Sequence, residues 1–136
     1  MRAVIDTGVW VSGVIRRQGT TGDVLRALRD GRFTAIYTTE TMVEAIEVLG
    51  RADFRVKYHI EPSDITALVN LIRFRGELAV STRKVEACRD PKDNKFLEAA
   101  VATPTDCIVS GDADLLVLVS FEGIPVLRPA EFLTKL

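Results

Sequence analysis

The sequence has few residues of the kinds that build covalent frameworks or soft metal sites. Its 136 residues include two cysteines, Cys88 and Cys107, and a single histidine, His59. Two thiols without CxxC spacing and one imidazole do not make a usual zinc site, and no Ser–His–Asp arrangement suggests itself. We therefore expect His59 on the surface and both cysteines reduced and in packing positions, which is consistent with a cytoplasmic protein.

Long apolar runs and an excess of one charge are also missing. No uncharged apolar stretch approaches the ~20 residues that cross a bilayer, and the N-terminus lacks the pattern of a secretory leader. Eighteen basic and 19 acidic residues give a net charge of −1. We therefore expect no membrane association and no simple nucleic-acid-binding module with a basic face. An enzyme that meets phosphate through a bound metal remains compatible with this charge.

Short apolar runs alternate with helical patterns along the chain, which has the 47% hydrophobic content of an ordinary globular protein. The pattern predicts one α/β domain over residues 1–136, with a mainly parallel central sheet flanked by helices. Thr7 and Gly8 are expected in a turn, and residues 51–60 resist assignment. Pro125 places the last strand at the sheet edge. The predicted strands are 3–5, 33–37, 78–80, 107–109 and 124–127. Helices are expected to begin near Thr20, Pro62, Pro91 and Pro129, with two more along residues 42–49 and through residues 115–116.

The stretch 89–100 organises the rest of the chain. Asp90 fits a helix N-cap and Pro91 fits the first helical position. Asp93 then falls in the first turn, on the same helical face as the apolar positions Phe96 and Leu97. Because a lone buried charge is costly, a carboxylate on a core-facing stripe needs a partner.

Other carboxylates supply that partner through a shared cation. Asp6 follows the first predicted strand and Asp112 follows the fourth. In open parallel sheets ligands bind beyond the carboxyl ends of the strands, so Asp6, Asp93 and Asp112 are expected to converge on one crevice. Crowded carboxylates repel one another, and a hard cation such as Mg²⁺ or Mn²⁺ removes the repulsion. Such a metal suits phosphodiester hydrolysis.

Each acid also has a structural explanation. Asp6 can turn the chain after its strand, Asp112 can cap the helix that follows it, and Asp90 is better explained as a cap than as a ligand. Asp93, in the first turn of its helix, can simply interact favourably with the helix dipole. Asp114 is about equally well explained as support for a metal ligand and as an ordinary surface charge. Glu44 lies with its neighbouring glutamates away from the apolar stripe, so a solvated face explains it equally well.

Four segments of the chain together resemble the PIN-domain ribonucleases, and more closely their VapC-like branch of toxins from toxin–antitoxin systems. The segments are 4–7, 38–51, 89–100 and 109–116, and they occur in the family's order and spacing. The resemblance implies a Rossmann-like sheet, Mg²⁺ or Mn²⁺ binding, and endonucleolytic cleavage of RNA. It also implies an antitoxin protein as partner and a homodimer. The implied acidic quartet is Asp6, Glu44, Asp93 and Asp112, with Asp6, Asp93 and Asp112 on the metal and Asp90 and Asp114 as additional acids.

One position departs from the family pattern. Gly8 stands where the family usually has an Asn that supports the first acid. We expect this change to loosen Asp6 unless Thr7 or Asn94 compensates. A PIN-like protein that has lost cleavage and only binds RNA or protein is therefore an alternative, and a phosphoacceptor signalling domain is a more distant one.

Overall fold

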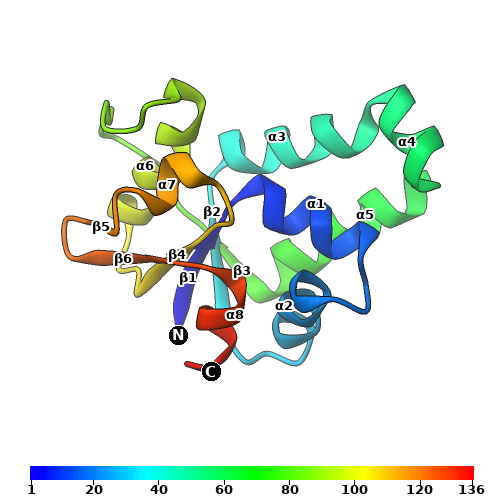
Figure 1. The fold of residues 1–136 in the computed structure, drawn as a ribbon, viewed down its shortest axis with the longest axis horizontal. Coiled ribbons are helices and arrows are strands. Elements are labelled where there is room, and N and C mark those ends of the chain that lie inside the picture. Colours follow the sequence, from blue (N-terminus) through cyan, green and yellow to red (C-terminus); the bar gives the residue numbers. More distant parts are fainter.

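The computed structural model describes residues 1–136 and is built on a six-stranded sheet in the order β3-β2-β1-β4-β6-β5 (Figure 1). All neighbouring strands run parallel except β5, which is antiparallel to β6. This confirms the predicted α/β class with a mainly parallel sheet. The strands are β1 (Arg2–Ile5), β2 (Thr34–Tyr37), β3 (Gly76–Leu78), β4 (Cys107–Val109), β5 (Ser120–Phe121) and β6 (Ile124–Leu127).

Helices cover both faces of the sheet, so its central strands are buried on both sides. In β1, Ala3 and Ile5 belong to one apolar cluster and Val4 belongs to a second one. The uninterrupted apolar character of this strand follows from that double burial. The helices are α1 (Thr7–Ile15), α2 (Thr20–Arg29), α3 (Thr39–Gly50), α4 (Ala52–Tyr58), α5 (Pro62–Arg75), the 3-10 turn η1 (Pro91–Asp93), α6 (Asn94–Ala102), α7 (Ala113–Leu116) and α8 (Pro129–Leu133).

Helix α1 corrects the prediction of a turn at Thr7 and Gly8. The segment is apolar on nearly every side because the helix lies in the interior, so it shows no amphipathic period. Asp6 starts the helix by accepting a hydrogen bond from the backbone of Val9. Gly13 lets α1 approach α2 closely, since a Cβ there would lie 2.9 Å from both a side-chain atom and a backbone oxygen of α2.

Three other assignments differ from the sequence prediction. The unassigned segment contains α4, which ends at Tyr58 and is capped by His59 in the left-handed region with a φ of 54°. The third strand begins two residues earlier than predicted because α5 leads into it directly. The prediction of an edge position for β6 is wrong, because the short strand β5 covers it. Pro125 is tolerated because the bonds to β4 are made around Val126 and Leu127.

Helices α2, α5 and α8 begin where the sequence predicted, whereas the helix expected from Pro91 starts as the 3-10 turn η1 and becomes α-helical at Asn94. Pro62 and Pro129 occupy the first turns of α5 and α8. In α3, Ala45 and Leu49 are buried in the core, whereas Ile46 is 38% exposed. None of the helices is long and apolar enough to cross a membrane.

Candidate functional site

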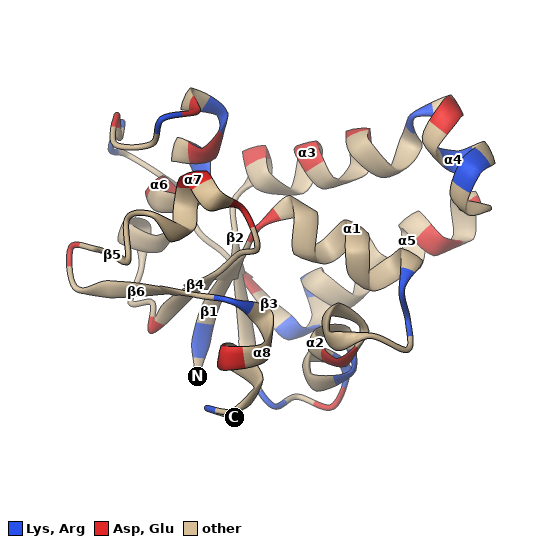
Figure 2. Ribbon diagram, viewed as in Figure 1, with Lys and Arg blue, Asp and Glu red and all other residues tan.

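A cleft of about 500 Å³ opens at the carboxyl ends of β1 and β4. The four acids of the predicted quartet line it together with the first turn of α1 and the start of α7. Figure 2 shows the acidic segments at the starts of α1, α6 and α7 gathered at this end of the sheet. The quartet is Asp6, Glu44, Asp93 and Asp112.

Asp6 is held by hydrogen bonds on both of its carboxylate oxygens. Its Oδ1 atom accepts from the backbone nitrogen of Val9 at 2.9 Å, and its Oδ2 atom accepts from the hydroxyl of Ser110. Asp6 is only 5% exposed, and this burial raises its pKa, while the two hydrogen bonds lower the pKa. Asp6 is therefore held on both oxygens, and not loosened as we expected from Gly8.

Ser110 was not singled out from the sequence, although it connects two of the acids. It is fully buried at the end of β4, where it donates to Asp6 and accepts from the backbone nitrogen of Asp112 at 2.9 Å. The proposed substitutes, Thr7 and Asn94, make their hydrogen bonds elsewhere. The sequence signal that could have identified Ser110 was a polar residue at the end of a predicted strand, two positions before an acid.

Asp93 is the acid with the least local support. It is 9% exposed, it makes no capping hydrogen bond at the start of α6, and its Oδ2 atom is buried without any hydrogen-bond partner. Burial, followed by the negative charge of Asp112, raises the pKa of Asp93 to about 7. A buried carboxylate with an unpartnered oxygen fits a missing positive ligand.

The additional acids lie beside Asp93. The carboxylate oxygens of Asp90, Asp93 and Asp114 lie within 4.8 Å of one another. Asp90 and Asp112 also cap η1 and α7, through the backbone nitrogens of Lys92 at 3.0 Å and of Asp114 at 2.8 Å. The structural explanation of these acids as caps is therefore correct, yet each cap uses only one of two oxygens.

Glu44 does not lie on a solvated face. One of its oxygens accepts from the hydroxyl of Thr7 and the other pairs with the ammonium group of Lys95. The Lys95 side chain is only 13% exposed. Sequence reasoning missed Lys95, which belongs to the same helix as the apolar stripe behind Asp93.

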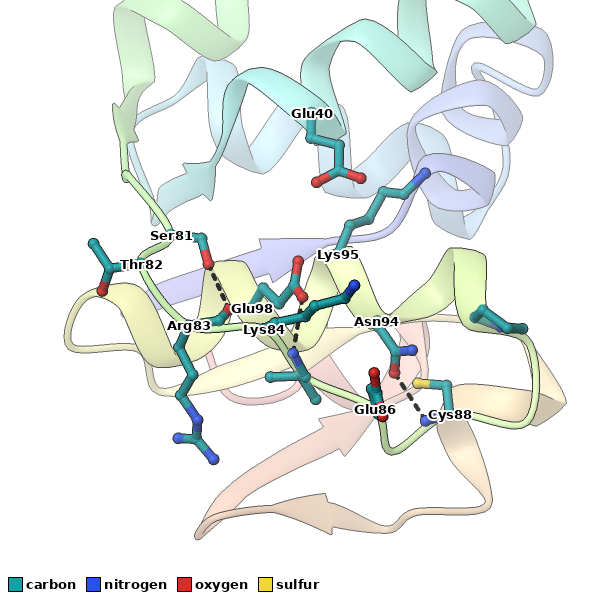
Figure 3. Close-up of a pocket in the computed structure, with 12 residues that line it drawn as sticks. Glu40, Ser81, Thr82, Arg83, Lys84, Glu86, Cys88, Asn94, Lys95 and Glu98 are labelled. Atoms are coloured by element: carbon teal, nitrogen blue, oxygen red, sulfur yellow. Dashed lines mark hydrogen bonds between the residues drawn. The ribbon is translucent and has the colours of Figure 1, made fainter.

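Lys95 also borders a second, open groove of about 850 Å³ (Figure 3). This groove lies under the loop 81–88, and Asn94 fixes the loop by accepting from the backbone nitrogens of Ala87 and Cys88 at 3.1 and 2.9 Å. Cys88 is a free thiol whose pKa is raised to about 11, mainly by burial. His59 is exposed, as expected, and Trp10 is buried in the core.

Comparison with known proteins agrees with this architecture. Residues 2–114 match the PIN domain family. The chain belongs to the PIN-domain family. The matched region contains all six acids of the site, from Asp6 to Asp114.

Two individual proteins resemble this PIN-domain chain. An uncharacterized protein of Methanocaldococcus jannaschii, MJ1680, is 25% identical over 118 residues, which cover 87% of this chain and 75% of that protein. A chain in the crystal structure of VapBC2 from Rickettsia felis bound to a DNA fragment from their promoter superposes with a TM-score of 0.59. That match covers 94% of this chain and 98% of the other at 9% identity, so it speaks for the fold alone.

Proposed function

We propose that this PIN-like domain, over residues 1–136, is a Mg²⁺- or Mn²⁺-dependent endoribonuclease. The observation that carries the proposal is the Oδ2 atom of Asp93, buried without a partner in a cleft lined by other carboxylates. All ligands that the cleft offers near Asp93 are oxygens, which suits a hard divalent cation. The donor set therefore fits the metal that the family resemblance implies.

The acids in the cleft have separate tasks in this proposal. Asp6, Asp93 and Asp112 hold the cation, which when bound activates water and stabilises negative charge on a phosphodiester. Ser110 orients Asp6 and Asp112 toward the cation through its two hydrogen bonds. Such support keeps ligand oxygens in place before the metal arrives.

Glu44 completes the quartet at the side of the cleft where Thr7 and Lys95 lie. Because both its oxygens are engaged, Glu44 is oriented before substrate enters. We assign it a role beside the cation, in positioning the nucleophile or the phosphate. Lys95 compensates its charge and supplies one positive group at the edge of an acidic cleft.

The proposal includes partners that the family resemblance implied. The similarity of fold to a chain of VapBC2 supports an antitoxin protein as partner, and we propose RNA as substrate and a homodimer as the working form. The two free cysteines are consistent with a cytoplasmic setting. Sedimentation of the purified chain measures the oligomer directly.

The test is cleavage of a panel of structured RNAs by the purified full chain with Mn²⁺. We expect internal cuts that vanish with excess EDTA and in Asp6→Asn, but persist in Asp53→Asn. Asp53 is a suitable control because it is exposed on α4, outside the cleft. Cleavage that persists unchanged in EDTA overturns the metal-nuclease proposal. No cleavage of any RNA, with binding retained, favours the alternative of a PIN-like module that only binds.

A further inference from the structure

The groove under the loop 81–88 lies next to the cleft but has no part in the proposed chemistry. Lys95 lines the groove, and its ammonium group pairs with Glu44, which lines the cleft. Asn94, in the groove, directly follows Asp93, in the cleft, and consecutive Cα atoms are only about 3.8 Å apart. An RNA chain whose scissile phosphate lies in the cleft can therefore place a neighbouring nucleotide in this groove.

Asn94 presents an unused hydrogen-bond donor to the groove. The residue is 9% exposed, and its Oδ1 atom accepts from the backbone nitrogens of Ala87 and Cys88 at 3.1 and 2.9 Å. An atom that accepts two hydrogen bonds is the amide oxygen, so the other atom is the NH₂ group. This Nδ2 atom makes no hydrogen bond within the protein, and Figure 3 shows it on the side of the amide away from Cys88. A donor buried and fixed in this way fits an acceptor on a bound ligand.

Glu98 presents an acceptor one turn further along α6. Its Oε2 atom accepts from the backbone nitrogen of Val85 at 2.9 Å, which leaves Oε1 without a partner. Residues four positions apart share one face of a helix, and both Asn94 and Glu98 line the groove. The groove therefore contains a donor beside a charged acceptor, and each is fixed by the backbone of the same loop.

The charges of the groove favour a base over the phosphate backbone. The guanidinium of Arg83 is engaged by Glu122 at 2.8 Å. The ammonium group of Lys95 is engaged by Glu44. The charged residues of the groove that have no ion-pair partner are three acids and one base, namely Glu40, Glu86, Glu98 and Lys84. This excess of negative charge repels phosphates, whereas a base is neutral and carries N–H groups that carboxylates accept.

We propose that the groove binds a guanine base of the RNA, next to the scissile phosphate, through Glu98 and Asn94. The pairing edge of guanine carries two N–H donors, on N1 and N2, beside the O6 acceptor. Glu98 accepts from the two donors, and Asn94 donates to O6. Adenine and cytosine offer a single amino group on this edge, and uracil offers one N–H between two carbonyl oxygens that a carboxylate repels. The inference rests on the proposed RNA substrate and adds the base that is recognised.

The experiment is binding of fluorescent uridine hexamers with one central guanosine, inosine, adenosine or cytidine to the full chain. It is done in EDTA by fluorescence anisotropy, so that the proposed cleavage does not consume the probe. The guanosine hexamer should bind about five- to fiftyfold more tightly than the adenosine hexamer. Inosine lacks only the N2 amino group, so its affinity should lie between those two. In nitrogen-15 NMR spectra the side-chain amide of Asn94 should shift with the guanosine hexamer.

Two variants alter the recognition and keep the bonds to the loop. In Glu98→Gln the amide oxygen stays on the backbone nitrogen of Val85 and the NH₂ group turns to the base, so the preference for guanosine should be lost. Asn94→Asp keeps an oxygen for the loop and replaces the donor by a second oxygen, so the affinity ratio of guanosine to adenosine should fall close to one. The ratio is the readout because a change of charge affects all hexamers alike. Glu47→Gln is the matched control, exposed on α3 and outside the groove, and should keep the preference.

Equal affinity for the four hexamers, or no binding of any, overturns the guanine site. A preference that survives in both Glu98→Gln and Asn94→Asp also overturns it, because the base is then recognised elsewhere. Guanosine-selective binding without cleavage in Mn²⁺ supports the site and contradicts the nuclease proposal. Cleavage in Mn²⁺ without any preference in binding supports the nuclease and removes the guanine site.

Discussion

Replacing Asp93 by Asn should stabilise the metal-free protein. The substitution keeps the shape of the side chain and removes one charge from a buried position among other carboxylates. The pKa of Asp93 is raised from 3.8 to about 7, with burial as the main cause and the charge of Asp112 second. An Asn at this position has no charge to bury, so the variant escapes that cost.

The sign of the effect depends on pH. Between pH 4 and 7 the folded state still holds the proton on the Asp93 carboxyl, because the pKa is raised there, whereas the unfolded chain has already released that proton. The folded wild type therefore loses stability as pH rises through that interval, and Asp93→Asn does not. At pH 8 the shift of about three pKa units, at about 1.4 kcal/mol each, sets an upper limit of about 4 kcal/mol. Since the cleft is open to water on one side, which screens the charge of Asp93, we expect about 1 to 3 kcal/mol, and close to none at pH 4.

Thermal melting at pH 8 and pH 4, with and without Mn²⁺, measures this difference. At about 3 °C per kcal/mol for a domain of this size, the variant should melt about 3 to 9 °C higher at pH 8 without metal. Mn²⁺ at a hundredfold excess over Kd should stabilise the wild type by about 2.7 kcal/mol and the variant by much less. Asp53→Asn should change stability by less than about 0.5 kcal/mol at either pH. An Asp93→Asn protein that melts below wild type at pH 8 and still shifts fully with Mn²⁺ refutes the reasoning.

Three further changes test the supports around the acids. Ser110→Ala should lower the free energy of unfolding in urea by about 1 to 3 kcal/mol. Because the hydrogen bond from the Ser110 hydroxyl lowers the pKa of Asp6, its loss should raise that pKa further and move the acid limb of the pH profile of cleavage to higher pH. An unchanged pH profile contradicts the role of Ser110. Lys95→Met should lower the rate of RNA cleavage at least tenfold, because the partly buried Glu44 needs a positive neighbour. Lys95→Arg keeps the positive charge and should retain part of the rate. Equal rates in the wild type and both variants would remove Lys95 from the site. Gly8→Asn should change Mn²⁺ affinity less than about threefold, because Asp6 already has both oxygens bonded. A Cβ at position 8 would lie 3.3 Å from Oδ1 of Asp6, a tight contact that the carboxylate relieves by a small shift. A large gain in calorimetric affinity would show that Asp6 is under-supported.

The sequence predicted those parts of the site that depend on local pattern. Asp6 and Asp112 each follow a short apolar run, and Asp93 follows a capped proline turn, so their place at strand ends and a helix start is readable without tertiary information. The same applies to the helices that begin at Pro62 and Pro129. Helix α1 was missed for the opposite reason, because a helix buried on nearly all sides loses the period that identifies it.

The supporting residues depend on contacts between distant segments. Ser110 meets Asp6 across 104 positions, and Lys95 meets Glu44 across 51. No local spacing encodes such pairs, and a serine or lysine at those positions is otherwise unremarkable. The grouping of Asp93 with Asp90 and Asp114 likewise joins segments that are more than 20 residues apart in the sequence.

The capping role of the acids has a consequence for substitutions that conserve charge. Asp6, Asp90 and Asp112 each give one oxygen to a backbone nitrogen of the turn that follows. That bond fixes the side-chain rotamer, so little rotational entropy is lost when the other oxygen takes a ligand. A glutamate has one methylene more and cannot keep its backbone bond while holding its second oxygen in the same place. Lengthening these side chains should therefore disturb the site about as much as neutralising them, which makes chain length, and not charge alone, the property that selection would preserve at these three positions.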